Sequence, residues 1–221
     1  MDFVEFCEEI RDRLFIKVSS FEKIKEKLEE IPYTRIENLA ISYHILLEKC
    51  ADKVTSIVVS KALFEKMGID KEEFHKEALE NSSRLFPVYV DNIKNIIFRI
   101  SDKDKICDDT LEIREMISKS MKKENEYPLF VVTNKIYTYG AATIFYDGVM
   151  EQIGESFGKN YFILPSSVHE MIILPDDGKF EYKKLKEIVE SVNREIVSPD
   201  DFLTDDVYYY NIEKHLFEIV G

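Results

Sequence analysis

The residue types that could do chemistry gather in one short stretch, LPSSVHE at residues 164–170. It places Ser166, Ser167, His169 and Glu170 between two apolar runs, YFIL and MIILP. In an extended chain, residues two apart share a face, so Ser167 and His169 would point the same way. A serine hydroxyl beside an imidazole, with Glu170 or a distant Asp assisting, is the arrangement of a serine hydrolase. We therefore take the four residues as candidate catalytic residues.

The same stretch also has a structural interpretation, as a turn. Pro165 fixes φ, and serine hydroxyls close turns by bonding to nearby backbone N–H groups. No G-x-S-x-G motif is present and no glycine-rich loop adjoins the serines, so the sequence supplies no evident oxyanion donors. A second serine pair, in NSSRLFP at residues 81–87, has no histidine near it in sequence and supports the turn. The sequence favours a turn over a catalytic site and leaves both open.

Other kinds of site find little support in the sequence. The 4 histidines are scattered singly, without the HExxH or H-x-H spacing that would place two metal ligands together. Neither a P-loop nor a G-x-G-x-x-G motif is present to cradle a phosphate. The paired carboxylates Asp176–Asp177, Asp200–Asp201 and Asp205–Asp206 are typical of helix caps and solvated loops. We therefore expect neither a metal site nor a bound cofactor.

The charge balance bears on the partners of this protein. The chain has 43 Asp and Glu against 30 Lys and Arg, a formal net charge of −13 over 221 residues. Affinity for nucleic acid depends on clustered Lys and Arg, so we expect no direct nucleic-acid binding. An acidic surface keeps a protein in solution, and it can also steer a basic partner or mimic nucleic acid.

Cysteine usage and hydropathy indicate the compartment. Cys7, Cys50 and Cys107 are odd in number and far apart, and they form neither a CxxC motif nor a disulfide framework, which is typical of a reducing compartment. The N-terminal MDFVEFCEEIRDRL carries acidic residues where a secretory signal has a basic start and an apolar run. No segment approaches the ~20 apolar residues that cross a bilayer. We predict a cytoplasmic protein that does not contact a membrane.

Tyrosines supply the best candidate for a protein interface. Most of the 12 tyrosines lie after residue 126, and tyrosine is favoured in interfaces because it combines apolar area with a polar tip. Strand alternation predicts that Tyr208 and Tyr210 share one face while Tyr209 takes the other. The candidate interface residues are Tyr137, Tyr139, Tyr208, Tyr209 and Tyr210. Strand propensity alone is the alternative explanation.

The first part of the chain is predicted to be mainly helical. Apolar spacing and caps such as Ser60, Gly68 and Asp70 support the helices. Alternation at Ile41, Tyr43 and Ile45 favours a hairpin, residues 38–48 and 54–59, over a helix opened by a capping box at Thr34. The expected helices span residues 3–14, 21–31, 61–67, 71–81, 90–100 and 108–121.

From Tyr127 onward, short β-branched or aromatic runs alternate with two helices in the order ββαββαββ. Short connections make such a sheet antiparallel. We predict an α+β fold, with a predominantly antiparallel sheet, packed helices and a helical N-terminus. The polar stretch Ser118–Glu126 divides it into units 1–117 and 127–221, unless the chain is one continuous domain. The expected strands are LFVVTN, AATIFY, YFILP, MIILP, VYYYN and LFEIV, with helices at 147–158 and 182–194.

Four segments together resemble a known family over residues 38–212. They are TSIVVSKALFEKMGIDKEEFHKEALENSSRLFP, LFVVTNKIYTYGAATIFYDGVMEQIG, YFILPSSVHEMIILPDD and VNREIVSPDDFLTDDVYYYN. The chain resembles an uncharacterised family of about this size, common in gut Firmicutes and known as a domain of unknown function. Its VVTN, GAA and LPSSxHE elements are also similar to a second uncharacterised family, of Bacillus type. The resemblance implies no activity, cofactor or partner.

These observations favour a non-catalytic cytoplasmic module that binds or regulates a protein, with an acidic, tyrosine-bearing C-terminal half. Two alternatives stay open. One is a hydrolase that uses Ser167 and His169. The other is an acidic mimic that blocks a nucleic-acid-binding protein. Substrate, partner and oligomeric state do not follow from the sequence.

Overall fold

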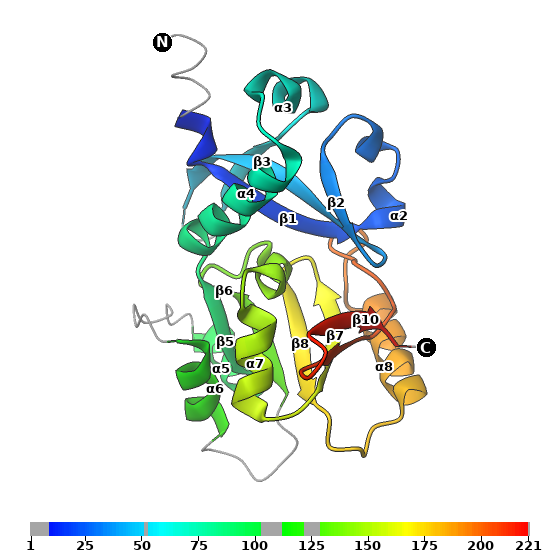
Figure 1. The fold of residues 1–221 in the computed structure, drawn as a ribbon. Helices are drawn as coiled ribbons and strands as arrows, with labels where there is room; N and C mark the ends of the chain where they lie inside the picture. The colour runs from blue at the N-terminus through cyan, green and yellow to red at the C-terminus, as the bar shows by residue number, and fades with distance from the viewer. Residues whose placement is uncertain (1–8, 51–52, 103–111, 122–128, 221) are drawn as a thin grey trace.

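Two β-sheets, each with its own helices, form two lobes stacked along the long axis of the molecule (Figure 1). The computed structural model describes residues 9–50, 53–102, 112–121 and 129–220. We call residues 9–85 the N-terminal lobe and residues 88–220 the C-terminal lobe. All strand pairs of the described residues are antiparallel, so the predicted α+β class is confirmed.

The N-terminal lobe is built around a four-stranded sheet. The long strand β3 lies at its centre, with β1 on one side and β2 and β4 end to end on the other. The predicted hairpin, now β3 and β4, is confirmed. The four strands are β1 (Leu14–Ser20), β2 (Tyr33–Ile36), β3 (Leu39–Lys49) and β4 (Val54–Val58).

Only part of the two helices predicted to open the chain is found. The first is helical at residues 9–11, a turn at residues 12–13 leads into β1, and residues 3–8 lie outside the described residues. The second is reduced to α2 (Phe21–Ile24) and the 3₁₀ helix η1 (Lys27–Glu29). Leu14, Ile16 and Val18 of β1 are buried against β3, because alternation over a strand decides here over helical spacing. The alternative capping box at Thr34 is not formed either, since Thr34 lies in β2.

Two helices of this lobe begin where the sequence predicts. In α3 (Lys61–Met67), Ser60 accepts a hydrogen bond from the N–H of Leu63, and Gly68 ends the helix at φ 64°. In α4 (Lys71–Leu85), Asp70 accepts from the N–H of Glu72. The helix α4 runs past Asn81 because Ser82 is fully buried, and its Oγ accepts a bond from the N–H of Ile16 at 2.9 Å. Ser82 thereby closes the outer edge of β1.

The C-terminal lobe is built around a six-stranded sheet in the order β10-β9-β7-β8-β6-β5. The predicted hairpins β7–β8 and β9–β10 are confirmed, and β6 lies where LFVVTN predicts a strand. Its strands are β5 (Val88–Asn92), β6 (Phe130–Asn134), β7 (Tyr161–Ser167), β8 (Glu170–Pro175), β9 (Tyr208–Asn211) and β10 (Leu216–Ile219).

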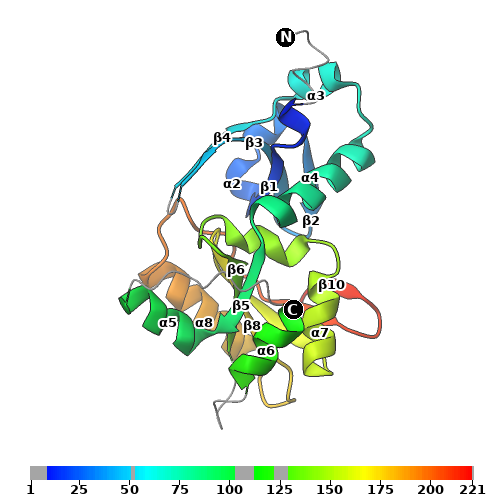
Figure 2. The same cartoon turned by 90° about the vertical axis from the view of Figure 1, so that its left-hand side faces the viewer.

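Helices cover both faces of this sheet (Figures 1 and 2). The helix α8 packs Leu185 and Val189 against Phe162 and Leu174, while Ile153 of α7 belongs to the core on the other face. The predicted helices at 147–158 and 182–194 are confirmed. The helices are α5 (Ile93–Asp102), α6 (Ile113–Met121), the 3₁₀ helix η2 (Gly140–Phe145), α7 (Val149–Phe157) and α8 (Tyr182–Glu195).

Two predictions in this lobe need correction. The segment AATIFY is not a strand but most of η2, whose six residues are all buried where the lobes meet. The predicted helix 90–100 begins only at Ile93, because Val88–Asn92 pairs with β6. The predicted start of α6, residues 108–111, lies outside the described residues. The two sheets lie on either side of Pro87 in the chain. The predicted division at Ser118–Glu126, with one continuous domain as its alternative, stays a prediction.

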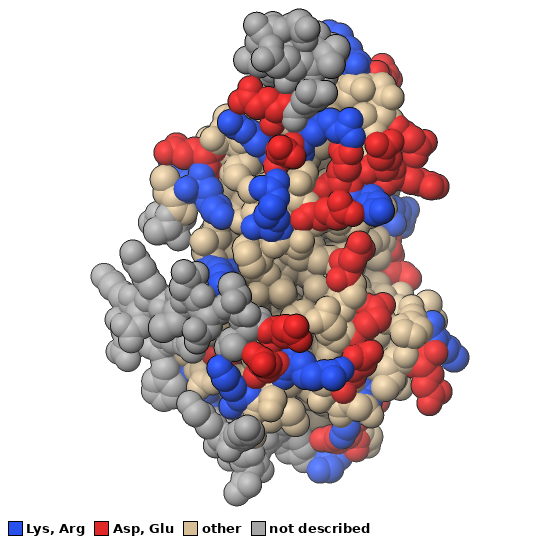
Figure 3. Space-filling model, turned by 60° about the vertical axis from the view of Figure 1, so that its left-hand side comes forward, with Lys and Arg blue, Asp and Glu red and all other residues tan. Residues whose placement is uncertain are grey.

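Charged side chains are mixed over the two lobes, and uncharged ones form a band between them (Figure 3). In that view, Lys and Arg are interspersed with Asp and Glu on both lobes. None of the described helices combines the length and the apolarity needed to cross a membrane.

Candidate functional site

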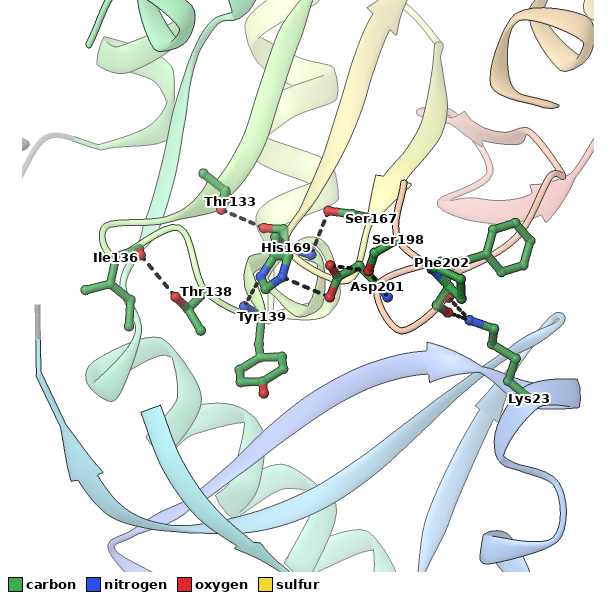
Figure 4. Close-up of polar contacts among 11 residues, drawn as sticks. Lys23, Thr133, Ile136, Thr138, Tyr139, Ser167, His169, Ser198, Asp201 and Phe202 are labelled. Atoms are coloured by element: carbon green, nitrogen blue, oxygen red, sulfur yellow. Dashed lines mark hydrogen bonds and ion pairs between the residues drawn. The ribbon is translucent and has the colours of Figure 1, made fainter. Parts of the chain in front are cut away.

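The imidazole of His169 lies at the turn between β7 and β8, where the lobes meet (Figure 4). Its Nδ1 accepts a hydrogen bond from the backbone N–H of Tyr139 at 3.2 Å. Because Nδ1 accepts, the proton of the neutral ring is on Nε2, which lies 3.2 Å from Oδ1 of Asp201. Both ring nitrogens therefore bond within the protein. We call Thr133, Tyr139, Ser167, His169 and Asp201 the His169 corner.

Asp201 joins the loop before β9 to the β7–β8 turn. Its Oδ2 accepts from the hydroxyl of Ser198 at 2.7 Å, so the carboxylate is held from its own loop. Its backbone carbonyl accepts from the N–H of Val168 at 2.8 Å. A main-chain bond and a side-chain bond thus fix the same two segments together. Asp201, which the sequence suggested only as part of a capping or solvated acidic pair, orients the ring of His169.

The serine hydroxyls serve the turn. Ser167 Oγ accepts from the backbone N–H of His169 at 3.1 Å, and Ser166 Oγ donates to Oε1 of Glu170 at 3.1 Å. Among the described residues, no hydrogen bond joins Ser167 Oγ to the imidazole of His169. The contact that a nucleophilic serine needs is therefore not formed, and the catalytic role of these four residues stays a prediction without it.

Residues at the end of β6 and the start of η2 donate hydrogen bonds to the β7–β8 turn. Thr133 Oγ1 donates to the carbonyl of His169 at 2.8 Å, and the N–H of Ala141 donates to the carbonyl of Val168 at 3.2 Å. A Cβ added to Gly140 would lie 2.5 Å from the carbonyl oxygen of His169 and 2.7 Å from the backbone nitrogen of Asn134. Glycine is therefore the residue that fits where these backbones approach one another.

Two lysines of the N-terminal lobe contact this corner. Lys17 of β1 lies with its Nζ 3.6 Å from the centre of the Tyr139 ring. Burial lowers the pKa of Lys17 to about 8. Lys23 of α2 donates to the carbonyls of Pro199 and Phe202, in the loop that holds Asp201. The corner thus fixes the two lobes to each other.

Asn38, between β2 and β3, adds a third link between the lobes. Its Nδ2 donates to Thr204 Oγ1 and to Asp206 Oδ2, both at 2.8 Å. Its Oδ1 accepts from the hydroxyl of Tyr208. Since the hydrogen-bonding groups at these junctions are matched across the lobes, the junction is a fixed contact between them.

The five candidate interface tyrosines are buried to different degrees. Tyr208 and Tyr210 are buried on one face of β9 and Tyr209 is half-buried on the other, so the predicted alternation is confirmed. The Tyr209 hydroxyl donates to Asp176 Oδ2 at 2.7 Å. Tyr137 and Tyr139 are half-buried, with φ of 53° and 54°. The tyrosines do not form one exposed surface, and their role in an interface stays a prediction.

A groove of about 400 Å³ opens between α4 of one lobe and α6 and α7 of the other. Its apolar part is formed by seven residues, and three acidic residues and Lys135 stand around it. It coincides with the uncharged band between the lobes, which carboxylates border in Figure 3. Sequence analysis missed the groove because its walls come from distant segments. The apolar residues are Leu79, Pro87, Val88, Ile113, Met116, Tyr146 and Val149; the acidic ones are Glu80, Glu112 and Asp147.

Comparison with known proteins gives one match. A family model described as a family of unknown function (DUF5688) matches residues 1–212. No curated protein and no solved structure was found to match the chain. In the part of the chain that the structure describes, no three His, Cys, Asp or Glu side chains gather as metal ligands.

Proposed function

The chain belongs to the DUF5688 family, and since that is a family of unknown function, we propose from the geometry that this protein is a non-catalytic module that binds another protein. The groove between the lobes is the observation that carries the proposal. A volume of about 400 Å³ lies within the range of about 300–1,000 Å³ in which protein pockets hold ligands. Its apolar walls and polar margin resemble the anatomy of a recognition site.

The His169 corner supports a non-catalytic role. A general base needs a free ring nitrogen facing the proton that it takes, and a nucleophilic serine needs that base within hydrogen-bond reach. Here the backbone N–H of Tyr139 bonds to Nδ1 and Asp201 bonds to Nε2. The corner instead fixes the lobes between which the groove lies, and a rigid groove loses less entropy when it binds.

Charge indicates the chemistry of the partner. Glu80, Glu112 and Asp147 outnumber Lys135 around the groove. Among the described residues, Glu112 and Asp147 form no ion pair, and Glu80 forms an exposed one with Lys76 at 3.8 Å. Exposed carboxylates around an apolar cleft favour a segment with apolar anchors flanked by Lys or Arg. We assign the groove to an amphipathic basic segment of another protein.

The cellular setting belongs to the same proposal. Three widely spaced cysteines that form no CxxC motif support a cytoplasmic location. The VVTN, GAA and LPSSxHE elements support a bacterial source and a relation to the Bacillus-type family. Mimicry of nucleic acid needs a contiguous row of carboxylates, and the mixture of both charges in Figure 3 does not support it.

Fluorescence anisotropy with two labelled peptides tests the groove. One is an amphipathic helical peptide of leucine and lysine, and the other has glutamate at each lysine position. We expect the lysine peptide to bind, the glutamate peptide not to bind, and binding to weaken with salt. The variant Glu112→Lys/Asp147→Lys should weaken binding of the lysine peptide at least about tenfold, because reversed charges at the groove repel it.

The control reverses the same number of charges elsewhere. Glu190→Lys lies on α8, which contributes no residue to the groove lining, and Glu213→Lys lies in the β9–β10 turn; both residues are exposed. This double variant should bind the lysine peptide within about twofold of wild type. Equal weakening of peptide binding in both double variants, or no binding by wild type, would contradict the assignment of the groove as the binding site. Hydrolysis of p-nitrophenyl acetate by wild type that is lost in Ser167→Ala refutes the non-catalytic role.

A further inference from the structure

Strand β4 forms an open edge of the N-terminal sheet. The N–H of Val59 donates to the carbonyl of Tyr43 at 2.9 Å, so the backbone groups of Val59 and Ile57 face β3. Backbone groups alternate in direction along a strand, so those of Val54, Ser56 and Val58 face away from it. In the described part of the chain, no hydrogen bond outside the strand ladder reaches these three residues. Figure 2 shows β4 at the margin of its lobe.

This edge lacks the features that usually prevent edge pairing. Natural edge strands carry charged side chains or proline, or are covered by another element. The strand VTSIV has no charge and no proline, and Ile57 and Val58 are 53% and 40% exposed. At the opposite edge, the N–H of Ile16 in β1 donates to Ser82 of α4. The edge at β1 is therefore bonded to a helix, while the edge at β4 stays able to accept a strand.

We propose that β4 pairs with β4 of a second copy of this chain, giving an antiparallel dimer with one sheet running through both copies. A twofold axis at Ser56 would place Val54 opposite Val58 of the second copy. The residues whose backbone groups face outward would then meet one another, and each such pair exchanges two hydrogen bonds. Thr55 would lie opposite Ile57 of the second copy, a β-branched pair that suits an antiparallel sheet.

The composition of β4 indicates that the strand pairing with it belongs to a second copy of the chain. A two-fold interface must be self-complementary, and an uncharged strand is compatible with its own copy in antiparallel register. A charged peptide would find no opposite charge on β4 itself. The net charge of −13 on each copy opposes association at long range, so added salt should strengthen the dimer. The proposal does not depend on the groove, whose lining contains no residue of β4.

Sedimentation velocity on the full chain over a range of concentrations tests this pairing. Wild type should sediment as monomer and dimer in proportions that shift with concentration. The variant Ser56→Pro removes a backbone N–H that faces outward, so it can block pairing without breaking the ladder to β3. It should raise the dimer dissociation constant at least about tenfold, since a ladder bond is lost and the ring interferes at the centre of the pair.

Two further variants separate loss of pairing from loss of folding. Ser56→Ala keeps the N–H and should dimerise as wild type does. Ile57→Lys keeps the backbone and places like charges across the edge, so it should also weaken the dimer. Circular dichroism should show a wild-type fold in all three variants. A wild type that stays monomeric at every concentration, or a dimer that is unchanged in both Ser56→Pro and Ile57→Lys, overturns the proposal.

Discussion

The His169 corner and strand β4 differ in how many of their hydrogen-bonding groups already have partners within the chain. The corner contains a serine, a histidine and an aspartate, yet its groups bond to one another and to nearby backbone atoms. The strand β4 contains valine, threonine, serine and isoleucine, yet the backbone groups of three of its five residues face outward without a partner in the described chain. The polar side chains of the His169 corner are therefore hydrogen-bonded within the fold, while β4 has backbone groups that are free to bond to another chain.

This difference predicts which region contributes to stability and which to association with another chain. A polar group whose partners lie inside the protein contributes to stability, because leaving it unpaired costs more than the bond contributes. A free backbone edge contributes little to folding and much to association. Substitutions in the corner should therefore change the free energy of unfolding, and substitutions on β4 should leave it nearly unchanged.

The largest loss of stability is expected for Gly140→Ala. A methyl group there meets the backbone of His169 and Asn134 at 2.5 and 2.7 Å, so the turn and β6 must move apart. We expect the free energy of unfolding to fall by about 3 kcal/mol, measured by urea denaturation. Gly178→Ala is the control, since nothing lies within 4 Å and its φ is 71°. It should cost ~1 kcal/mol, and an equal loss in both variants would remove the close approach as the cause.

A smaller loss is expected for His169→Asn. The shorter side chain cannot reach both the Tyr139 N–H and Asp201, and one of them loses its partner. The free energy of unfolding should fall by about 1–2 kcal/mol, as for a partly buried hydrogen-bonded group. His215→Asn is the matched control, because His215 is 66% exposed and lies 3.8 Å from Glu151; it should cost less than about 0.5 kcal/mol. Equal effects would mean that the corner does not brace the lobes.

Local signals predicted much of this fold, and long-range contacts account for the rest. Ser60, Gly68 and Asp70 identify α3 and α4 because a cap is a contact within a few residues. The strand β1 was missed because its partners are residues 39–45, which sequence spacing does not reveal. AATIFY looks like a strand by propensity, but burial between the lobes makes it a 3₁₀ helix.

The candidate site was predictable in the same limited way. Ser167 and His169 stand out together in LPSSVHE, and their turn role follows from residues two apart. Asp201 and Tyr139, which bond to the two ring nitrogens, lie about thirty residues away on either side of His169, so only the fold brings them to the ring. The groove is less accessible still, because α4, α6 and α7 form it together and none has a distinctive motif.

The pH dependence of stability tests the environment of His44, the residue of β3 that pairs with Val58 of β4. Burial, and then the charge of Lys17, lowers the pKa of His44 to about 3. Between that value and the unfolded pKa of about 6.5, the unfolded chain binds a proton that the folded chain does not, so stability falls as pH falls. From pH 7 to 5.5 this group should remove about 1 kcal/mol. His44→Gln should reduce that slope, measured by urea denaturation at each pH, and an unchanged slope would exclude His44.

The smallest effect on stability is expected on β4 itself. Ile57 is 53% exposed and contributes its side chain mainly to the open edge. In Ile57→Thr, a β-branched residue replaces another, so the free energy of unfolding should change by less than about 0.5 kcal/mol at protein concentrations where the chain is monomeric. The matched substitution Ile45→Thr, at the buried residue that pairs with Ile57 across the hairpin, should cost ~2 kcal/mol or more because it puts a hydroxyl into the core. Similar losses in the two variants would mean that β4 is part of the folded core and that its edge is not free for a second copy.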